Sequence, residues 1–287
     1  GPGASQKKSH GKGHRNTHSG APSLTTTAMH RTAVRAVGVW PSEPARSSVA
    51  RPLPIVTPQA GRTRGAGRPD LELRPVRVKM GTVTEAAGSC YLEMGSTKIL
   101  CSVHGPRPDP RAAHFSNTGR LECNVKVPPF CGADDFEEHE KQMPAVLCSA
   151  LEAAIDLTRF PKSVVDIALV VLEMDGDATS AAITCASMAL ADACIEMYGL
   201  VAACAVVRTS GGQLLVDPEG VEMAGNATAV VAFMPARGEV TLLNHHGEMG
   251  VEELQQAMRV GVEATKQIHG VMRAQLLAGV EGEQGKE

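Results

Sequence analysis

Residues 163–198 constrain the fold of this chain more than any other stretch. Residues 164–172 are almost continuously apolar and largely β-branched, interrupted only by Asp166, which is typical of a strand buried on both faces. The turn 173–177 (EMDGD) follows, and Asp177 is well placed to cap a helix of about twenty residues rich in Ala, Ser and Thr. A buried strand that delivers acidic side chains to the start of a helix is where a phosphate or metal site would be built.

Length and composition narrow the class of protein. The chain has 287 residues, of which 43% are hydrophobic, enough for a proper globular core. No apolar run approaches the roughly 18 residues that a membrane span needs, so we expect neither a transmembrane segment nor a membrane partner. The eight cysteines include no CxxC pair, which argues against a zinc ribbon and predicts buried, reduced thiols in a cytosolic or nuclear protein.

The charge is divided unevenly along the chain. Residues 1–70 hold eleven Lys and Arg against two acidic residues, a net charge of +9, whereas the remainder holds 17 against 29, a net charge of −12. The first part, rich in Gly, Ser, Pro and Thr, is predicted to be a disordered basic extension that contacts nucleic acid, has no fixed partner or acts as a targeting segment. We expect a folded domain over residues 71–279 and a polar tail over residues 280–287.

Hydrophobic periodicity predicts a mixed α/β domain (α+β, with a mixed sheet). A helix is expected to begin with Pro144 in its first turn and to be stopped by Arg159-Phe160-Pro161. A long helix is expected over residues 251–277. The predicted strands cover residues 74–80, 89–93, 98–103 (a hairpin with its turn at Gly95), 120–127, 164–172, 200–208, 213–216, 227–234 and 239–243.

Five segments, in this order and at this spacing, carry a family resemblance: AGSCYLEMGSTKILCSVHGPR (87–107), GRLECNV (119–125), the helix end at 151–157, MDGDATSAAIT (174–184) and ALADACIEMYGLV (189–201). Together they resemble the RNase PH superfamily over roughly residues 74–278. The resemblance implies a βαβα-type fold related to domain 2 of ribosomal protein S5, with subunits assembled into a six-membered ring. The last segment, RFP (159–161) and GPR (105–107) are most similar to a branch whose members are core-ring subunits of the RNA exosome.

The resemblance also implies where a phosphorolytic site would lie. Phosphorolysis of RNA needs an anion site for inorganic phosphate and carboxylates that hold a metal ion or act as an acid. Active members carry a Gly-Gly-Arg-Thr-type segment that matches residues 137–140 here (EEHE), so that acids and His139 stand where a guanidinium is wanted. They also carry an acid about five residues before the acid of the Asp-Gly turn, and that position falls on Val170, beside Ala168 and Leu169.

The Asp-Gly turn itself is retained. Asp175 is present, with Glu173 and Asp177 nearby, although turn and helix-cap roles explain Asp175 and Asp177 as well. We therefore expect a pseudo-enzyme with a degenerate site around Asp175, Asp177, His139 and Val170. No catalytic residue, no bound metal ion and no cofactor are expected.

Four basic side chains of the folded part are the candidates for contacts with RNA phosphates, because family loops in this region line the channel of the ring: Arg107, Arg111, Arg120 and Lys126. Surface charges without a fixed partner explain them equally well. His245-His246 is predicted to lie in an exposed turn, and the acids of residues 134–140 on a solvated face, rather than in metal sites. An aromatic content of 3% argues against a base-stacking platform.

The function implied by the resemblance is that of a non-catalytic, structural subunit of the RNA exosome core ring that supports 3′-to-5′ RNA processing. Its expected partners are another RNase PH-like subunit, S1/KH cap proteins and RNA, and its expected location is the nucleus, including the nucleolus, and the cytoplasm. Two alternatives remain open: an active phosphate-dependent 3′-to-5′ exoribonuclease, and an RNA-binding protein that acts through its basic arm.

Overall fold

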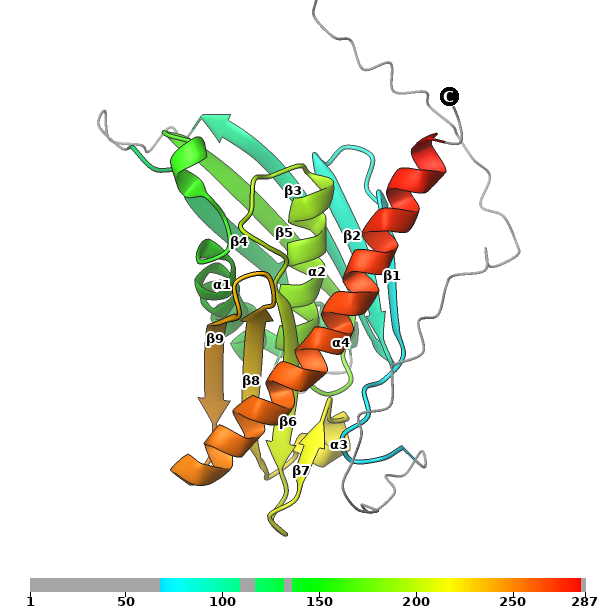
Figure 1. The fold of residues 1–287 in the computed structure, drawn as a ribbon, viewed down its shortest axis with the longest axis vertical. Coiled ribbons are helices and arrows are strands. Elements are labelled where there is room, and N and C mark those ends of the chain that lie inside the picture. Colours follow the sequence, from blue (N-terminus) through cyan, green and yellow to red (C-terminus); the bar gives the residue numbers. More distant parts are fainter. Residues whose placement is uncertain (1–67, 109–116, 132–135, 285–287) are drawn as a thin grey trace, which may run out of the picture. The chain divides into compact units, whose positions relative to one another are not determined.

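The computed structural model describes residues 68–108, 117–131 and 136–284, which contain two β-sheets and the helices that cover them (Figure 1). The five-stranded sheet has the order β1-β2-β3-β5-β4 and the four-stranded sheet the order β7-β6-β8-β9. The first sheet comprises β1 (Val76–Met80), β2 (Gly88–Met94), β3 (Thr97–Pro108), β4 (Arg120–Lys126) and β5 (Ser163–Glu173). The second comprises β6 (Ala202–Arg208), β7 (Leu214–Val216), β8 (Ala227–Met234) and β9 (Glu239–His246).

The described residues also contain four α-helices and two short 3₁₀ turns. They are α1 (Phe136–Glu152), α2 (Ala178–Asp192), α3 (Gly220–Met223) and α4 (Val251–Gln284), and the 3₁₀ turns are η1 (Pro129–Cys131) and η2 (Leu157–Arg159). The described part of the chain is therefore a mixed α/β fold, as the sequence predicts.

The five-stranded sheet is mixed, because β4 runs parallel to β5 whereas the other neighbours are antiparallel. The predicted hairpin is confirmed: Met94 pairs with Thr97, and Gly95 adopts a φ of +58° in the turn, a conformation that favours glycine. The expectation that β5 is buried on both faces holds only for the first part of the strand. Its odd-numbered residues from Val165 to Val171 are buried, whereas on the other face Val164 and Asp166 are buried but Ala168 and Val170 are only half-buried.

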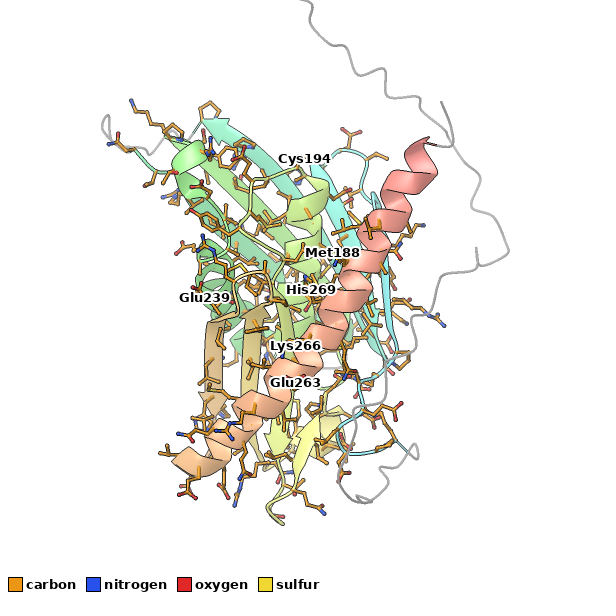
Figure 2. The ribbon with its side chains drawn as sticks, in the orientation of Figure 1. Met188, Cys194, Glu239, Glu263, Lys266 and His269 are labelled. Carbon is orange, nitrogen blue, oxygen red and sulfur yellow. The ribbon has the colours of Figure 1, made fainter. Side chains whose placement is uncertain are left out.

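Helix α2 packs against β2 and β3 of one sheet and β6 of the other (Figure 1). Its Ala, Ser and Thr side chains permit this close approach, and almost the whole helix is buried, including Met188, which Figure 2 labels. The buried hydroxyl groups are used in the contact: Thr184 accepts a hydrogen bond from the Ala203 backbone N–H at 3.1 Å, and Ser187 accepts one from that of Val201 at 2.9 Å. The helix is therefore tied to the strand that follows it as well as packed on it.

Helix α4 lies across β6 and β8 of the four-stranded sheet (Figure 1). Gly261 permits the contact, because a Cβ atom there would lie 2.9 Å from Cγ2 of Val231. Ala257, Ala264, Ile268 and Met272 form the buried stripe of the helix, while Glu263 and Lys266 pair at 2.7 Å on its outer side (Figure 2). Among the described residues, no helix combines the length and the apolar character that crossing a membrane requires.

The structure corrects the predicted start of the first long helix. Pro144 is an interior residue of α1, which begins eight residues earlier, at Phe136. Glu137 and Glu138 lie in the first turn, where carboxylates interact favourably with the helix dipole, and the buried stripe already includes Met143. Acid–dipole interactions and burial thus outweigh the cost of a proline inside the helix.

Three other boundaries in the structure differ from those that the sequence predicts. Helix α1 ends at Glu152, ahead of the predicted stop at residues 159–161. Helix α2 ends at Asp192, because Cys194 adopts a φ of +56° and the chain then returns to pair Met197 with Ile155. His245 and His246 lie at the end of β9, opposite Ala229 and Thr228, rather than in a turn.

Candidate functional site

The Asp-Gly turn joins the end of β5 to the start of α2. Gly176 adopts a φ of +85°, and a Cβ atom there would lie 2.1 Å from the carbonyl oxygen of Pro218. The turn therefore requires glycine at this position for two reasons, its backbone conformation and this close approach. The Met174 N–H donates to the carbonyl of Cys131 at 2.9 Å, which connects the turn to η1. The turn at the end of β5 is therefore in contact with η1 and with Pro218.

Both carboxylate oxygens of Asp175 have partners within the chain. The Gly220 N–H donates to Oδ1 at 3.1 Å, and Nη1 of Arg74 lies 3.6 Å from Oδ2. The backbone carbonyl of Asp175 accepts hydrogen bonds from Arg74 Nη1 at 2.9 Å and from the Thr97 hydroxyl at 2.8 Å. The Asp175 carboxylate thus contacts both α3 and the segment around Arg74, which precedes β1.

Arg74 and Asp217 form the centre of this network. Arg74 donates from Nε to Oδ2 at 2.9 Å and from Nη2 to Oδ1 at 2.7 Å, and its backbone N–H donates to Oδ2 at 2.9 Å. Arg68 donates from Nη2 to the backbone carbonyl of Asp217 at 3.0 Å. Burial lowers the pKa of Arg74, but the hydrogen bond and charge of Asp217 outweigh it, so the pKa is raised and the guanidinium stays charged.

Sequence reasoning missed this buried ion pair. The two residues are 143 positions apart, and Arg74 occupies a strand-like segment in which it reads as a surface charge. The sequence carries one related signal, because Asp217-Pro218 follows an apolar strand and interrupts its pattern. That signal predicts a turn, but it does not identify the residue with which Asp217 pairs.

Asp177 acts as the N-cap of α2, which confirms its predicted structural role. Its Oδ1 accepts from the Thr179 N–H at 3.2 Å and its Oδ2 accepts from the Ser180 N–H at 2.7 Å. Both carboxylate oxygens are thus occupied by backbone donors. A carboxylate in this arrangement neutralises the positive end of the helix, which would otherwise attract an anion.

The remaining positions of the predicted degenerate site lie on β5 and α1. Val170 sits mid-sheet, with Leu100 and Lys126 opposite it on the two neighbouring strands. Glu138 is exposed and His139 half-buried in the first turns of α1. Val170 is an apolar residue at the position expected for an acid.

Glu140 closes the start of α1 against β4. Its carboxylate accepts from Nζ of Lys126 at 2.5 Å and from the Val127 N–H at 3.3 Å. The hydrogen bond from Lys126, followed by that from Val127, lowers the pKa of this carboxyl. Glu140 on α1 thus forms an ion pair with Lys126 on the neighbouring strand β4.

Each described candidate for RNA contact is paired with an acid of this chain. Arg107 pairs with Asp166, Arg120 with Glu122 and Lys126 with Glu140, while the three basic side chains remain 62%, 43% and 71% exposed. Arg111 lies outside the described residues, as do Asp134 and Asp135 of the acidic cluster. Arg107 and Arg120 both lie opposite Val164 in the two registers, so they occupy the same end of the sheet.

Asp166 and Glu122 bring two carboxyl groups together at that end, since they face each other across β5 and β4. Burial raises the pKa of Asp166, Arg107 acts in the opposite direction, and Glu122 adds to the rise. Within the described part of the chain, no cluster of three or more His, Cys, Asp or Glu side chains is placed to hold a metal ion.

This two-sheet fold, with a buried Ala-rich helix capped by Asp177 after an Asp-Gly turn, is that of an RNase PH-like domain. The model of the 3′ exoribonuclease family, domain 1 (RNase PH), matches residues 72–196. An Arabidopsis thaliana protein named exosome complex component RRP41-like is 37% identical over 217 residues, covering 74% of this chain and 83% of its own. The chain belongs to the RNase PH family.

Three further comparisons bear on the branch and the fold. The human exosome complex component MTR3 is 35% identical over 230 residues, which cover 73% of this chain and 85% of that protein. The crystal structure of rice Rrp46 superposes with a TM-score of 0.68 at 25% identity, covering 75% of this chain and all of the other. An Archaeoglobus fulgidus exosome with RNA bound to its active site matches at a TM-score of 0.65 and 18% identity, covering 72% of this chain and 91% of that chain, a likeness of fold alone. The resemblance drawn from the sequence and the predicted fold class are confirmed.

Proposed function

We propose that this chain is a non-catalytic, structural subunit of the RNA exosome core ring. The family membership and the relatives named exosome components, at 35% and 37% identity, support the placement in that complex. In this role the chain supports 3′-to-5′ RNA processing and degradation by scaffolding the ring and guiding RNA towards a nuclease carried by another subunit.

The observation that carries the non-catalytic assignment is the engagement of Asp175. Its carboxylate already contacts Arg74 and the Gly220 N–H, and the position five residues earlier is Val170. A metal ion needs free carboxylate oxygens, and a phosphate ion needs cations rather than the acids at the start of α1. The arrangement therefore favours holding the fold together over phosphorolysis.

The described part carries apolar side chains that a partner subunit would cover. Large ones are exposed on three separate elements, at Phe130 (75%), Val221 (89%) and Val251 (74%). Val170 and Leu172 on β5 are only half-buried. In an obligate assembly, apolar side chains of this kind lie in the interface between subunits.

The proposed partners follow from this role. They are a second RNase PH-like subunit in a six-membered hetero-oligomeric ring, S1/KH cap proteins, and RNA contacted by Arg107, Arg120, Lys126 and Arg111. No cofactor is required for scaffolding. The proposed locations are the nucleus, including the nucleolus, and the cytoplasm.

The test is purification of the tagged full-length chain under native conditions, followed by mass determination of the intact assembly and of its subunits. The proposal predicts a stable hetero-oligomer that contains other RNase PH-like chains. A chain recovered with RNA but without ring subunits, and losing that RNA when residues 1–70 are deleted, would support an RNA-binding protein instead. A homo-oligomer would favour the phosphorolytic enzyme.

A further inference from the structure

The two sheets of the described part have four edge strands, which differ in how well they are protected from pairing with another chain. Short strands, charged side chains and covering elements are the usual protection. Strand β7 has three residues, and β1 carries the exposed side chains of Arg77 and Lys79. Beside β4, Glu140 of α1 accepts a hydrogen bond from the Val127 N–H. Strand β9, at the remaining edge, has eight residues and contains no lysine, arginine or proline (Figure 1).

Most of β9 is exposed to solvent. Helix α1 contacts the strand, and Thr241 and Leu242 are half-buried, but the other six residues are exposed. These six include two large apolar side chains, Val240 (39%) and Leu243 (38%). A long edge strand that exposes apolar side chains is a surface at which another strand can add.

The register with β8 assigns the residues of β9 to the two faces of the sheet. Thr241 is the extra residue of a bulge, since Leu242 pairs with Ala232 whereas Val240 pairs with the next residue, Phe233. The paired residues on either side of the bulge therefore alternate regularly between the faces. One face is formed by Val240, Leu243 and His245, and the other by Glu239, Leu242, Asn244 and His246.

Strand β9 is complementary to a second copy of itself. Two copies can run antiparallel with Leu243 opposite Leu243 at a two-fold axis, and counting the paired positions outward from that axis then places Glu239 opposite His246 of the other copy. Val240 lies opposite His245 in the same register. A carboxylate accepts a hydrogen bond from a neutral imidazole and forms an ion pair with a charged one, so the contact of Glu239 with His246 is favourable in both cases.

The polar side chains of β9 are available for such a contact. Within the described part of the chain, no hydrogen bond or ion pair engages the side chains of Glu239, Asn244, His245 and His246. On the edge strand β1, by contrast, Arg77 pairs with Glu93 of the neighbouring strand. Glu239, which Figure 2 labels, begins β9 and is exposed. The charged and polar groups at both ends of β9 can therefore pair with another chain without breaking a contact among the described residues.

We propose that the isolated chain forms a two-fold symmetric dimer in which the β9 strands of two copies pair antiparallel and join their four-stranded sheets into one. Backbone hydrogen bonds hold the two strands together, Leu243 packs against Leu243 at the axis, and the two contacts between Glu239 and His246 set the register. The dimer covers this edge while the chain is not held by other subunits. It is therefore a separate matter from the subunit composition of an assembly purified from its native source.

The experiment measures the mass of the isolated full-length chain by analytical ultracentrifugation over a range of concentrations. We expect a reversible equilibrium between monomer and dimer, because one strand edge buries less surface than a permanent dimer interface does. Leu243→Lys places two like charges at the axis and should abolish the dimer. Val221→Lys is the matched control, because it changes an apolar side chain that is 89% exposed on α3, and it should leave the dimer unchanged.

A charge swap tests the register. In His246→Glu, two carboxylates face each other at both ends of the paired strands, and we expect the dissociation constant of the dimer to rise by about tenfold. The double variant Glu239→Lys/His246→Glu restores opposite charges and should recover the affinity of the wild type. Both side chains are exposed, so the fold should tolerate these changes, and circular dichroism checks that each variant is folded.

An isolated chain that stays monomeric overturns the proposal. If Leu243→Lys then also prevents assembly with other subunits, the edge belongs to one of those subunits instead. A dimer that persists in Leu243→Lys, or one that the double charge variant does not recover, shows that the contact lies on another surface or in another register, and each of these results overturns the proposal as well.

Discussion

Arg74 and Asp217, which are 143 residues apart in the sequence, meet through two parallel hydrogen bonds of 2.9 and 2.7 Å inside the protein. The side chain of Arg74 is 6% exposed and that of Asp217 is 4% exposed. The same guanidinium contacts Asp175, so the acid that the Asp-Gly turn would offer to a substrate is tied into a structural network. On the proposed non-catalytic role, this relationship explains how the acid of the Asp-Gly turn is kept as a structural residue.

The first prediction concerns the stability that this ion pair provides. Replacing Arg74 with methionine leaves the buried carboxylate of Asp217 without its main partner, and we expect a loss of about 3 to 5 kcal/mol in the free energy of unfolding. Urea denaturation of the full-length chain measures it.

The matched control for that variant is Lys98→Met. Lys98 pairs with Glu173 at 2.6 Å, but both side chains are well exposed, at 40% and 48%. An exposed pair adds little stability, because solvent and salt screen the two charges, so this variant should be nearly neutral. Equal losses of unfolding free energy in the two variants would show that the buried Arg74–Asp217 pair stabilises the fold no more than an exposed pair does.

The second prediction concerns the cap of the buried helix. Removing the Asp177 carboxylate in Asp177→Ala leaves the N–H groups of Thr179 and Ser180 without an acceptor, and we expect a loss of about 1 kcal/mol. Asp177→Ser keeps a capping oxygen and should retain most of the stability. Thermal unfolding of the three proteins gives the comparison, and an Ala variant as stable as the wild type would contradict the role.

The third prediction concerns pH. The raised pKa of Asp166, caused first by burial, means that the folded state binds this proton more tightly than the unfolded state. The free energy of unfolding of the wild type relative to Asp166→Asn should therefore rise as the pH falls from neutral through the folded pKa. The change should be complete below the unfolded value of about 3.9.

Glu140 supplies the control of opposite sign. Its pKa is lowered, first by the hydrogen bond from Lys126, so its contribution is present above the unfolded value of about 4.3 and is lost as the pH falls through the folded pKa. The wild type should therefore lose stability relative to Glu140→Gln as the pH falls from about 4.3 through the folded pKa of Glu140, a lower range than the one in which it gains relative to Asp166→Asn. Urea titrations at several pH values test both, and differences of the same sign would refute the assignment.

The fourth prediction concerns RNA. In the assembled complex, alanine at Arg107, Arg120 or Lys126 should weaken RNA binding by a similar factor for different sequences, because phosphate contacts carry no sequence information. Each lost contact should reduce the slope of log affinity against log salt by about 0.7. Arg77→Ala on β1, at the other edge of the sheet, should leave the slope unchanged. Unaltered slopes in all three variants would show that these side chains do not contact RNA phosphates.

Local sequence signals predicted the elements that depend on neighbouring residues. The hairpin around Gly95, the strand that becomes β5 and the Asp177 cap are each specified by a few consecutive side chains. The start of α1 was predicted wrongly, because Pro144 is a strong local signal that the buried Met143 and the acids of the first turn override. Local propensity gives way where tertiary burial decides.

The chemistry of the site depends on contacts that the sequence does not display. Asp175 was recognised as the retained acid, but its engagement by Arg74 and the Gly220 N–H requires segments that are distant in the chain to meet. Composition and periodicity predict which elements form, but they do not specify these pairings.

The central claim is tested most directly by a phosphorolysis assay on RNA with inorganic phosphate, using the assembled complex and the isolated chain, each with wild-type Asp175 and with Asp175→Asn. The account predicts that the isolated chain releases no nucleoside diphosphates and that Asp175→Asn leaves the activity of the complex unchanged once it has assembled. Phosphate-dependent release of nucleoside diphosphates by the isolated chain, abolished by Asp175→Asn, would contradict it.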